Sequence, residues 1–158
     1  MDSRLRVIGP GDWEEFRALR LMALADSPDA FGATLAEASA QPPDVWRDRA
    51  TGPGPVVLAS TDDRPVAMGG LHLPEDTDDA FVWGMWVAPA SRGQGLAARI
   101  LGQLLERADR DRRPVVLHVT QGNDDARRLY VRHGFEATGE VQPLRQGSDV
   151  LVDTLRRG

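Results

Sequence analysis

The sequence contains no cysteine and no lysine. Without cysteine the chain can form no disulfide, thiolate nucleophile or Cys-ligated zinc site, and a cytoplasmic location is the default expectation. All 19 basic residues are arginine, so no lysine can act as a Schiff base or a phosphate ligand. No run of 18 apolar residues is present to span a membrane, and Met1–Arg4 lack the apolar segment of a signal peptide. We therefore expect a protein that does not bind membranes.

The remaining composition is that of an ordinary globular domain. Hydrophobic residues make up 41% of the 158 residues and charged residues 27%, which is enough apolar surface for a core. At this length we expect one domain, residues 1–158. The formal net charge of -5 argues against a nucleic-acid partner, which usually meets a basic face, and agrees with a cationic or neutral substrate.

Apolar periodicity, interrupted by Gly, Pro and Asp clusters, predicts helices and strands in the order β-α-α-β-β-β-α-β-α-β-β. The first helix follows Asp12 and ends at Ser27, with an apolar stripe formed by Trp13, Phe16, Leu19, Met22 and Ala23. Further helices are expected at 45–50, 96–109 and 123–133, and strands at 5–8, 55–60, 66–73, 80–88, 115–119, 135–141 and 148–155. A run of antiparallel hairpins thus leads into one βαβ unit. The prediction is an α+β fold with a mixed, mostly antiparallel sheet flanked by helices.

A glycine-rich segment, Ser91-Arg92-Gly93-Gln94-Gly95, lies between the predicted strand 80–88 and the predicted helix 96–109. The first turn of a helix has unpaired N–H groups and partial positive charge, so this position suits a phosphate, although a plain strand-to-helix turn would also need glycines. A Walker loop is excluded because no Gly-Lys-Ser/Thr follows. A dinucleotide-binding loop is excluded because the next strand ends at Thr120-Gln121, without the expected acidic residue.

Two motifs resemble those of the Gcn5-related N-acetyltransferase (GNAT) superfamily. Arg92-Gly93-Gln94-Gly95-Leu96-Ala97 is similar to its (Arg/Gln)-x-x-Gly-x-(Gly/Ala) pyrophosphate loop, and Val87-Ala88-Pro89 to the strand end before it. About 30 residues on, Asn123-x-x-Ala126-x-x-Leu129-Tyr130-x-x-x-Gly134-Phe135 resembles its second motif. The resemblance implies a GNAT-like sheet in which the fourth and fifth strands begin parallel and then splay apart.

The resemblance also implies which residues bind acetyl-CoA. The fourth strand would pair with the pantetheine amides, the loop backbone would hold the pyrophosphate, and an asparagine would contact the cofactor arm. These roles fall on Met85, Trp86, Val87, Arg92, Gly93, Gln94, Gly95, Leu96, Ala97 and Asn123.

Tyr130, the only tyrosine, resembles the family's general acid, which protonates the departing thiolate; it could equally be a core aromatic. Backbone N–H groups near Val87 could stabilise the oxyanion. The fourth strand carries no ionisable residue, and on the fifth strand His118 stands where some relatives have glutamate. His118 is therefore the candidate base, with His72 as a second candidate and a structural, cross-sheet hydrogen-bonded role as the alternative for His118.

Other side chains bear on the acceptor. Strand alternation predicts Trp83, Met85 and Val87 on one face of the fourth strand and Val82, Gly84 and Trp86 on the other. Core packing is the simplest role for these side chains, but Trp86 could line an acceptor pocket. In the region around residues 30–35, Asp29 and Glu37 could attract an ammonium group.

The sequence thus predicts an N-acetyltransferase that moves an acetyl group from acetyl-CoA to a primary amine by direct transfer in a ternary complex. The amine could belong to a small molecule or to a peptide N-terminus, and a homodimer is possible. No metal is expected, because the HxExxH, EF-hand and CxxC spacings are absent. The alternative from another functional class is a non-catalytic module that binds acyl-CoA or a partner protein.

Overall fold

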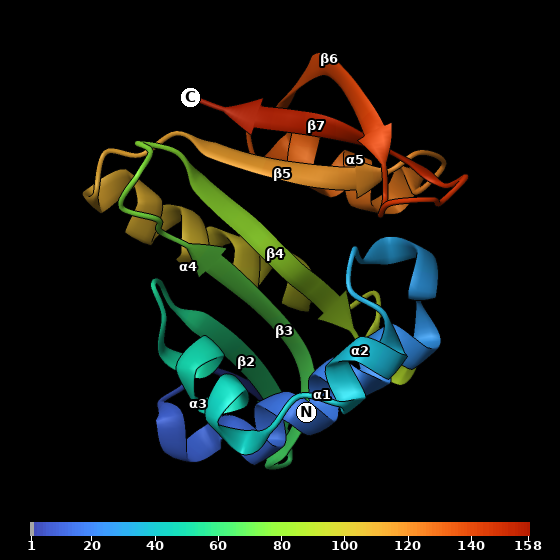
Figure 1. Ribbon diagram of the computed structural model, residues 1–158. Coiled ribbons are helices and arrows are strands. Elements are labelled where there is room, and N and C mark those ends of the chain that lie inside the picture. Colours follow the sequence, from blue (N-terminus) through green and yellow to red (C-terminus); the bar gives the residue numbers. More distant parts are fainter. Residues whose placement is uncertain (1) are drawn as a thin grey trace.

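Seven strands form one mixed sheet in the computed structural model, which describes residues 2–158 (Figure 1). The sheet order is β1-β2-β3-β4-β5-β7-β6, and only the β4–β5 pair is parallel. The strands are β1 (Ser3–Val7), β2 (Val56–Thr61), β3 (Arg64–His72), β4 (Ala80–Val87), β5 (Val115–Thr120), β6 (Glu136–Pro143) and β7 (Leu151–Arg157). The helices are α1 (Trp13–Asp26), α2 (Leu35–Ser39), α3 (Pro43–Thr51), α4 (Leu96–Arg110) and α5 (Asp124–Arg132). The predicted fold class is confirmed, and the seven expected strands are all present in the chain.

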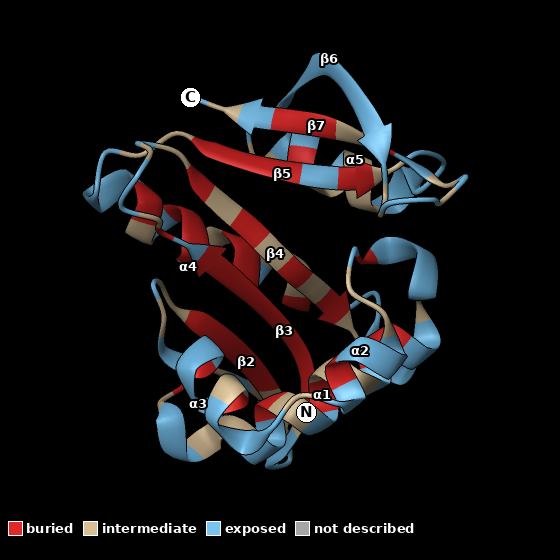
Figure 2. Ribbon diagram, in the orientation of Figure 1, coloured by how far each residue is buried: buried red, intermediate tan, exposed pale blue. Residues whose placement is uncertain are grey.

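Helices cover both faces of the sheet and create two separate cores (Figures 1 and 2). On one face α4 and α5 bury a cluster that includes Ile100, Leu104 and Tyr130. On the other face α1 and α3 bury a cluster centred on Phe16 and Trp46, whose rings meet edge to face at 5.4 Å. Both faces of the central strands are therefore buried, which explains why β2 and β3 are rich in apolar and small residues.

The first helix differs from its predicted stripe. Phe16, Leu19 and Ala23 are buried as expected, but Met22 is 53% exposed. The buried face instead includes Leu24. Because residues four apart lie one above the other on a helix, Arg20 lies between Phe16 and Leu24 on the side that faces the sheet.

One helix was not predicted, and one strand boundary shifts by several residues. The unpredicted helix is α2, which Thr34 caps: the Glu37 N–H donates to Thr34 Oγ1 at 3.2 Å. The last strand begins at Leu151 rather than Ser148, because residues 144–150 form a turn in which Leu144 N–H donates to Val150 O at 2.8 Å.

None of the helices in residues 2–158 combines the length and the apolar character needed to cross a bilayer.

Candidate active site

The strands β4 and β5 separate soon after they begin. They pair only at Ala80 with Val115 and at Phe81 with Val116. Beyond Phe81 the edge of β4 that faces β5 has no strand partner in the described chain, and the facing edge of β5 is equally free (Figure 1). The gap is therefore lined on both sides by backbone N–H and C=O groups that are available to an amide-bearing ligand.

A β-bulge in β4 lies beside this gap. Gly70 pairs with Trp83 and Met68 with Trp86, so β4 has two residues, Gly84 and Met85, opposite one residue of β3. Gly84 has φ +67°, a conformation that favours glycine.

The bulge makes the predicted alternation of β4 wrong. Trp83 and Trp86 both pack against the core beneath α1 and α3, whereas Val82, Met85 and Val87 pack against the core beneath α4. One extra residue reverses the face of every side chain that follows it. The indole rings of Trp83 and Trp86 therefore lie on the same face of the sheet, the one that α1 and α3 cover.

The loop before α4 presents a row of free donors. The N–H groups of residues 93–98 have no backbone acceptor in the described chain, and no side chain caps α4. Gly93 and Gly95 have φ +80° and +78°, and a Cβ at either position would meet nothing within 4 Å. The helix terminus is thus open, and its donors and partial positive charge suit a diphosphate.

Arg92 uses its side chain to brace this loop. Its Nε donates to Val87 O at 2.9 Å, and its Nη2 donates to Asp26 Oδ2 at 2.8 Å. The same Asp26 oxygen accepts the Trp86 indole N–H at 3.0 Å. Hydrogen bonds from Ser27, Trp86 and Arg92 hold the pKa of Asp26 below its ordinary value. The guanidinium therefore joins the end of α1, the end of β4 and the loop.

Tyr130 lies on α5 in the core beneath β5, 7% exposed and edge to face with Phe135 at 5.8 Å. Burial raises the pKa of its hydroxyl to about 12, and no hydrogen bond to that hydroxyl is found within residues 2–158. Asn123 caps α5, with Oδ1 accepting the Ala126 N–H at 3.3 Å. Its side-chain NH₂ remains the group through which it can reach a ligand.

The histidines occupy different environments. His118 is exposed on β5, and within residues 2–158 its imidazole makes no hydrogen bond, so the cross-sheet side-chain bond considered for it is not formed. Since Leu117 and Val119 point into the core beneath α4, His118 points to the opposite face. Thr120 lies on that same face, and its hydroxyl donates to Asp29 O, in the α1–α2 connection, at 2.6 Å. His133 caps α5, with Nδ1 2.8 Å from Leu129 O.

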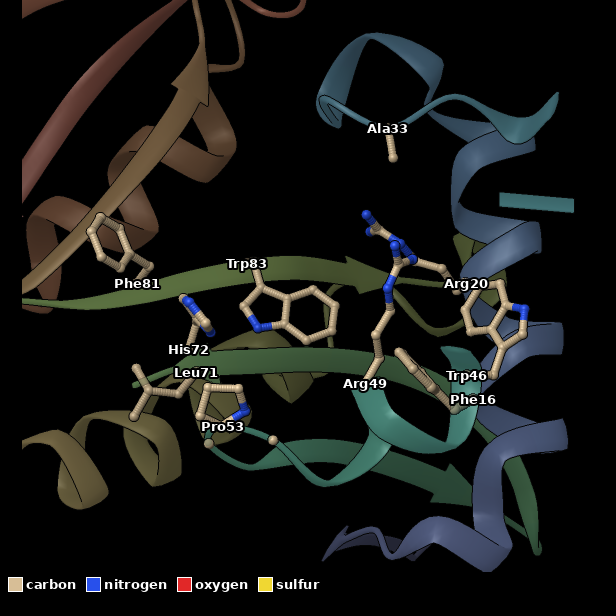
Figure 3. Close-up of a pocket in the computed structure, with 12 residues that line it drawn as sticks. Phe16, Arg20, Ala33, Trp46, Arg49, Pro53, Leu71, His72, Phe81 and Trp83 are labelled. Atoms are coloured by element: carbon tan, nitrogen blue, oxygen red, sulfur yellow. The ribbon is translucent and has the colours of Figure 1, made fainter. Parts of the chain in front are cut away.

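A cavity of about 480 Å³ lies on the α1–α3 face of β4 (Figure 3). Its walls include Trp83, His72 and two arginines, Arg20 and Arg49. Neither arginine is among the site residues predicted from the sequence. The spacing of Arg20 could have indicated its role, because a residue four positions after Phe16 lies on the core-facing side of an amphipathic helix. Glu37 does not line the cavity: its carboxylate accepts the Thr34 hydroxyl at 2.9 Å.

Proteins named as acetyltransferases resemble this chain both in sequence and in structure. The chain is 30% identical over 138 residues to mycothiol acetyltransferase of Brachybacterium faecium, covering 85% of this chain and 40% of that protein. It is 31% identical over 90 residues to L-2,4-diaminobutyric acid acetyltransferase of Methylotuvimicrobium alcaliphilum, covering 56% of this chain and 49% of that protein. The chain thus spans less than half the length of either relative.

Among solved structures, yncA from Salmonella typhimurium with its cofactor acetyl-CoA superimposes with a TM-score of 0.78 at 16% identity, over 99% of this chain and 93% of that chain. The pattern of the acetyltransferase (GNAT) family matches residues 18–135, a span that holds the bulge, the glycine loop, the splayed strands and Tyr130. The chain belongs to the acetyltransferase (GNAT) family.

Proposed function

We propose that the protein transfers the acetyl group of acetyl-CoA directly to a primary amine. The observation that carries this proposal is the adjacency of two features: the row of free N–H groups at residues 93–98 and the unpaired backbone edges between β4 and β5. The first fits a diphosphate and the second fits a chain that contains amides. When bound, acetyl-CoA supplies the acetyl group as an activated thioester.

The residues assigned to the cofactor divide into three groups. Met85, Trp86 and Val87 would pair with the amide-bearing arm along the β4 edge that has no strand partner, where the Val87 carbonyl already accepts Arg92 Nε. The loop from Arg92 to Ala97 would hold the diphosphate through backbone N–H groups, with the Arg92 side chain keeping the loop in place. Asn123 would contact the arm through its free NH₂ group while its oxygen caps α5.

Acyl transfer needs an unprotonated amine, a stabilised oxyanion and a proton for the departing sulfur. Backbone N–H groups of β4 near Val87 would stabilise the negative charge on the carbonyl oxygen. Tyr130 would donate the proton, because a tyrosine hydroxyl is protonated at neutral pH and this one has no hydrogen-bond partner within residues 2–158. His118 would take the proton from the amine, directly or through water, since it is exposed on the side of the sheet that holds the cavity.

The acceptor is proposed to be a small-molecule amine. One relative is named for such a compound, L-2,4-diaminobutyric acid, and the cavity beside β4 has the size of a small-molecule site. A peptide N-terminus is the alternative acceptor within the same chemistry.

A thiol-release assay tests the proposal directly, and the absence of cysteine from the chain leaves coenzyme A as the only thiol detected. Purified protein is incubated with acetyl-CoA and a panel of primary amines, including short peptides with free N-termini. We expect amine-dependent release of thiol with formation of the N-acetyl product. If calorimetry shows tight binding of acetyl-CoA but no amine causes release of coenzyme A, the protein is a non-catalytic acyl-CoA-binding module instead.

A further inference from the structure

The cavity on the α1–α3 face of β4 has an unusual combination of charges. Two arginines line it, Arg20 from α1 and Arg49 from α3, and no aspartate or glutamate does. Within residues 2–158 neither guanidinium has an ion-pair partner. Figure 3 shows the two guanidinium groups pointing toward each other inside the cavity, with Trp83 beside them. A chain with a net charge of -5 thus places two positive charges in the lining of one cavity.

Arg20 is held with its donors unused. Its guanidinium stacks over the Phe31 ring at 4.7 Å and lies 5.8 Å from the Trp83 ring. Stacking uses the flat faces of the group and leaves the N–H edge free, yet Nη1 is buried without any hydrogen-bond partner. Burial, and then the neighbouring charge of Arg49, lowers the pKa of Arg20 to about 10. A buried charge without a partner is costly, so the site is incomplete as the chain alone presents it.

The position of Arg20 relates the cavity to the chemistry. A Cβ placed on Gly84 would lie 3.5 Å from Arg20 Nη1, so this nitrogen sits directly against the β4 bulge. The residues that follow the bulge, Met85 to Val87, form the free strand edge of the proposed acetyl-CoA site. A ligand bound to Arg20 would therefore reach the reacting end of that site from the opposite face of the sheet.

We propose that this cavity holds the acceptor and that Arg20, with Arg49 beside it, binds an anionic group on it, so that the substrate is an amine that also carries a carboxylate. This inference rests on the proposed function. A carboxylate accepts two parallel N–H bonds from a guanidinium fork, which would satisfy the unused edge of Arg20. The aromatic walls formed by Trp83, Phe16 and Trp46 would contact the apolar part of such an amino acid.

The test compares matched pairs of acceptors with the full chain. Each L-amino acid, with L-2,4-diaminobutyrate included, is assayed for thiol release beside its own carboxamide. We expect the acids to be better acceptors than the amides by roughly tenfold to hundredfold in kcat/KM, the range for one charge-assisted hydrogen-bonding group. Aminoalkyl phosphates are included, and a preference for them over the acids would overturn the carboxylate assignment.

Variants locate the effect. Arg20→Gln should remove the preference for acids mainly through KM, while its affinity for acetyl-CoA and its melting temperature are retained, because the change deletes a buried unpaired charge. Arg17→Gln is the matched control: Arg17 lies one turn earlier on α1 and lines a different hollow, with Trp13 and Pro43. It should keep the wild-type preference.

A binding measurement separates this inference from the proposed function. Quenching of tryptophan fluorescence by the same acids and amides, in the presence of coenzyme A, reports occupancy without turnover. If acids bind to the wild type and not to Arg20→Gln while no amine is acetylated, the proposed function fails and the anion site stands. Equal behaviour of acids and amides in both turnover and binding overturns the anion site, whatever amine is acetylated.

Discussion

The Trp86 indole on β4 donates its N–H to Asp26 at the last position of α1, with 3.0 Å between Nε1 and Oδ2. The same carboxylate oxygen receives Arg92 at 2.8 Å. One carboxylate therefore connects the end of β4 to the loop that precedes α4, and Trp86, which was considered for the acceptor pocket, is not among the residues that line the cavity. A change at Asp26 should therefore alter both the free energy of unfolding and the position of that loop.

Replacing Asp26 with Asn should lower the melting temperature at neutral pH, because three hydrogen bonds to the ionised form hold its pKa below the ordinary 3.8. A lowered pKa in the folded state means that the stabilisation is fully present above pH 3.8 and is lost as the pH falls through the folded-state pKa. The difference in melting temperature between wild type and Asp26→Asn should therefore be constant near neutrality and shrink in acid. Asp149→Asn, an exposed change in the β6–β7 loop, should show no such pH-dependent difference.

The glycine loop can be tested with a matched pair of alanine variants. Gly95 and Gly147 have nearly the same backbone conformation, φ +78° and +81°, and in both a Cβ would meet nothing within 4 Å. Each alanine should reduce the free energy of unfolding by about 1–2 kcal/mol, the cost of a left-handed residue. Calorimetric titration should show that only Gly95→Ala weakens acetyl-CoA binding, by roughly tenfold, through misdirected N–H groups. Equal acetyl-CoA affinity of the two variants would remove the loop from the binding site.

The element order and the glycine loop were predictable because each depends on local sequence: apolar periodicity, turn residues and a short motif. The faces of β4 were not, since alternation assumes a regular strand and the bulge at Gly84 shifts every later side chain. Arg20 was missed although its spacing from Phe16 puts it on the core-facing side of α1. The cavity that it lines is formed by α1, α3, β3 and β4 together, and no local sequence pattern describes such an arrangement.

Two glycine-to-alanine changes, one at the β4 bulge and one inside α4, should have opposite effects on the free energy of unfolding. Gly84→Ala should reduce the free energy of unfolding by about 1–2 kcal/mol, because φ is +67° and the new Cβ would lie 3.2 Å from Met68 Cε. Gly102→Ala, in the interior of α4 with nothing within 4 Å, should raise it by about 0.5–1 kcal/mol. Denaturant unfolding monitored by circular dichroism measures both. A neutral Gly84→Ala would mean that the bulge is not required at this position.

Tyr130→Phe separates catalysis from packing. Within the part of the chain that the structure describes, the hydroxyl has no hydrogen-bond partner, so its removal should change the free energy of unfolding little, and acetyl-CoA affinity should be retained. If Tyr130 protonates the departing thiolate, turnover of a good amine should fall by roughly 100-fold, a typical contribution of a general acid. Because burial raises the pKa of Tyr130 to about 12, its deprotonation should cause no decline in wild-type kcat between neutral and moderately alkaline pH. Wild-type turnover by Tyr130→Phe would show that Tyr130 packs in the core and takes no part in the reaction.

The base is tested by the pH dependence of kcat/KM in histidine variants. An imidazole changes protonation near neutral pH, so a histidine base gives a rate that rises with pH through that region. His118→Ala should abolish this rise and lower the plateau, whereas His133→Ala should keep the profile, because His133 is bonded to Leu129 O at the end of α5. His72→Ala tests the second candidate, which lines the cavity. A profile unaltered in His118→Ala but flattened in His72→Ala would move the proton acceptor from β5 to β3, to a residue that lines the cavity itself.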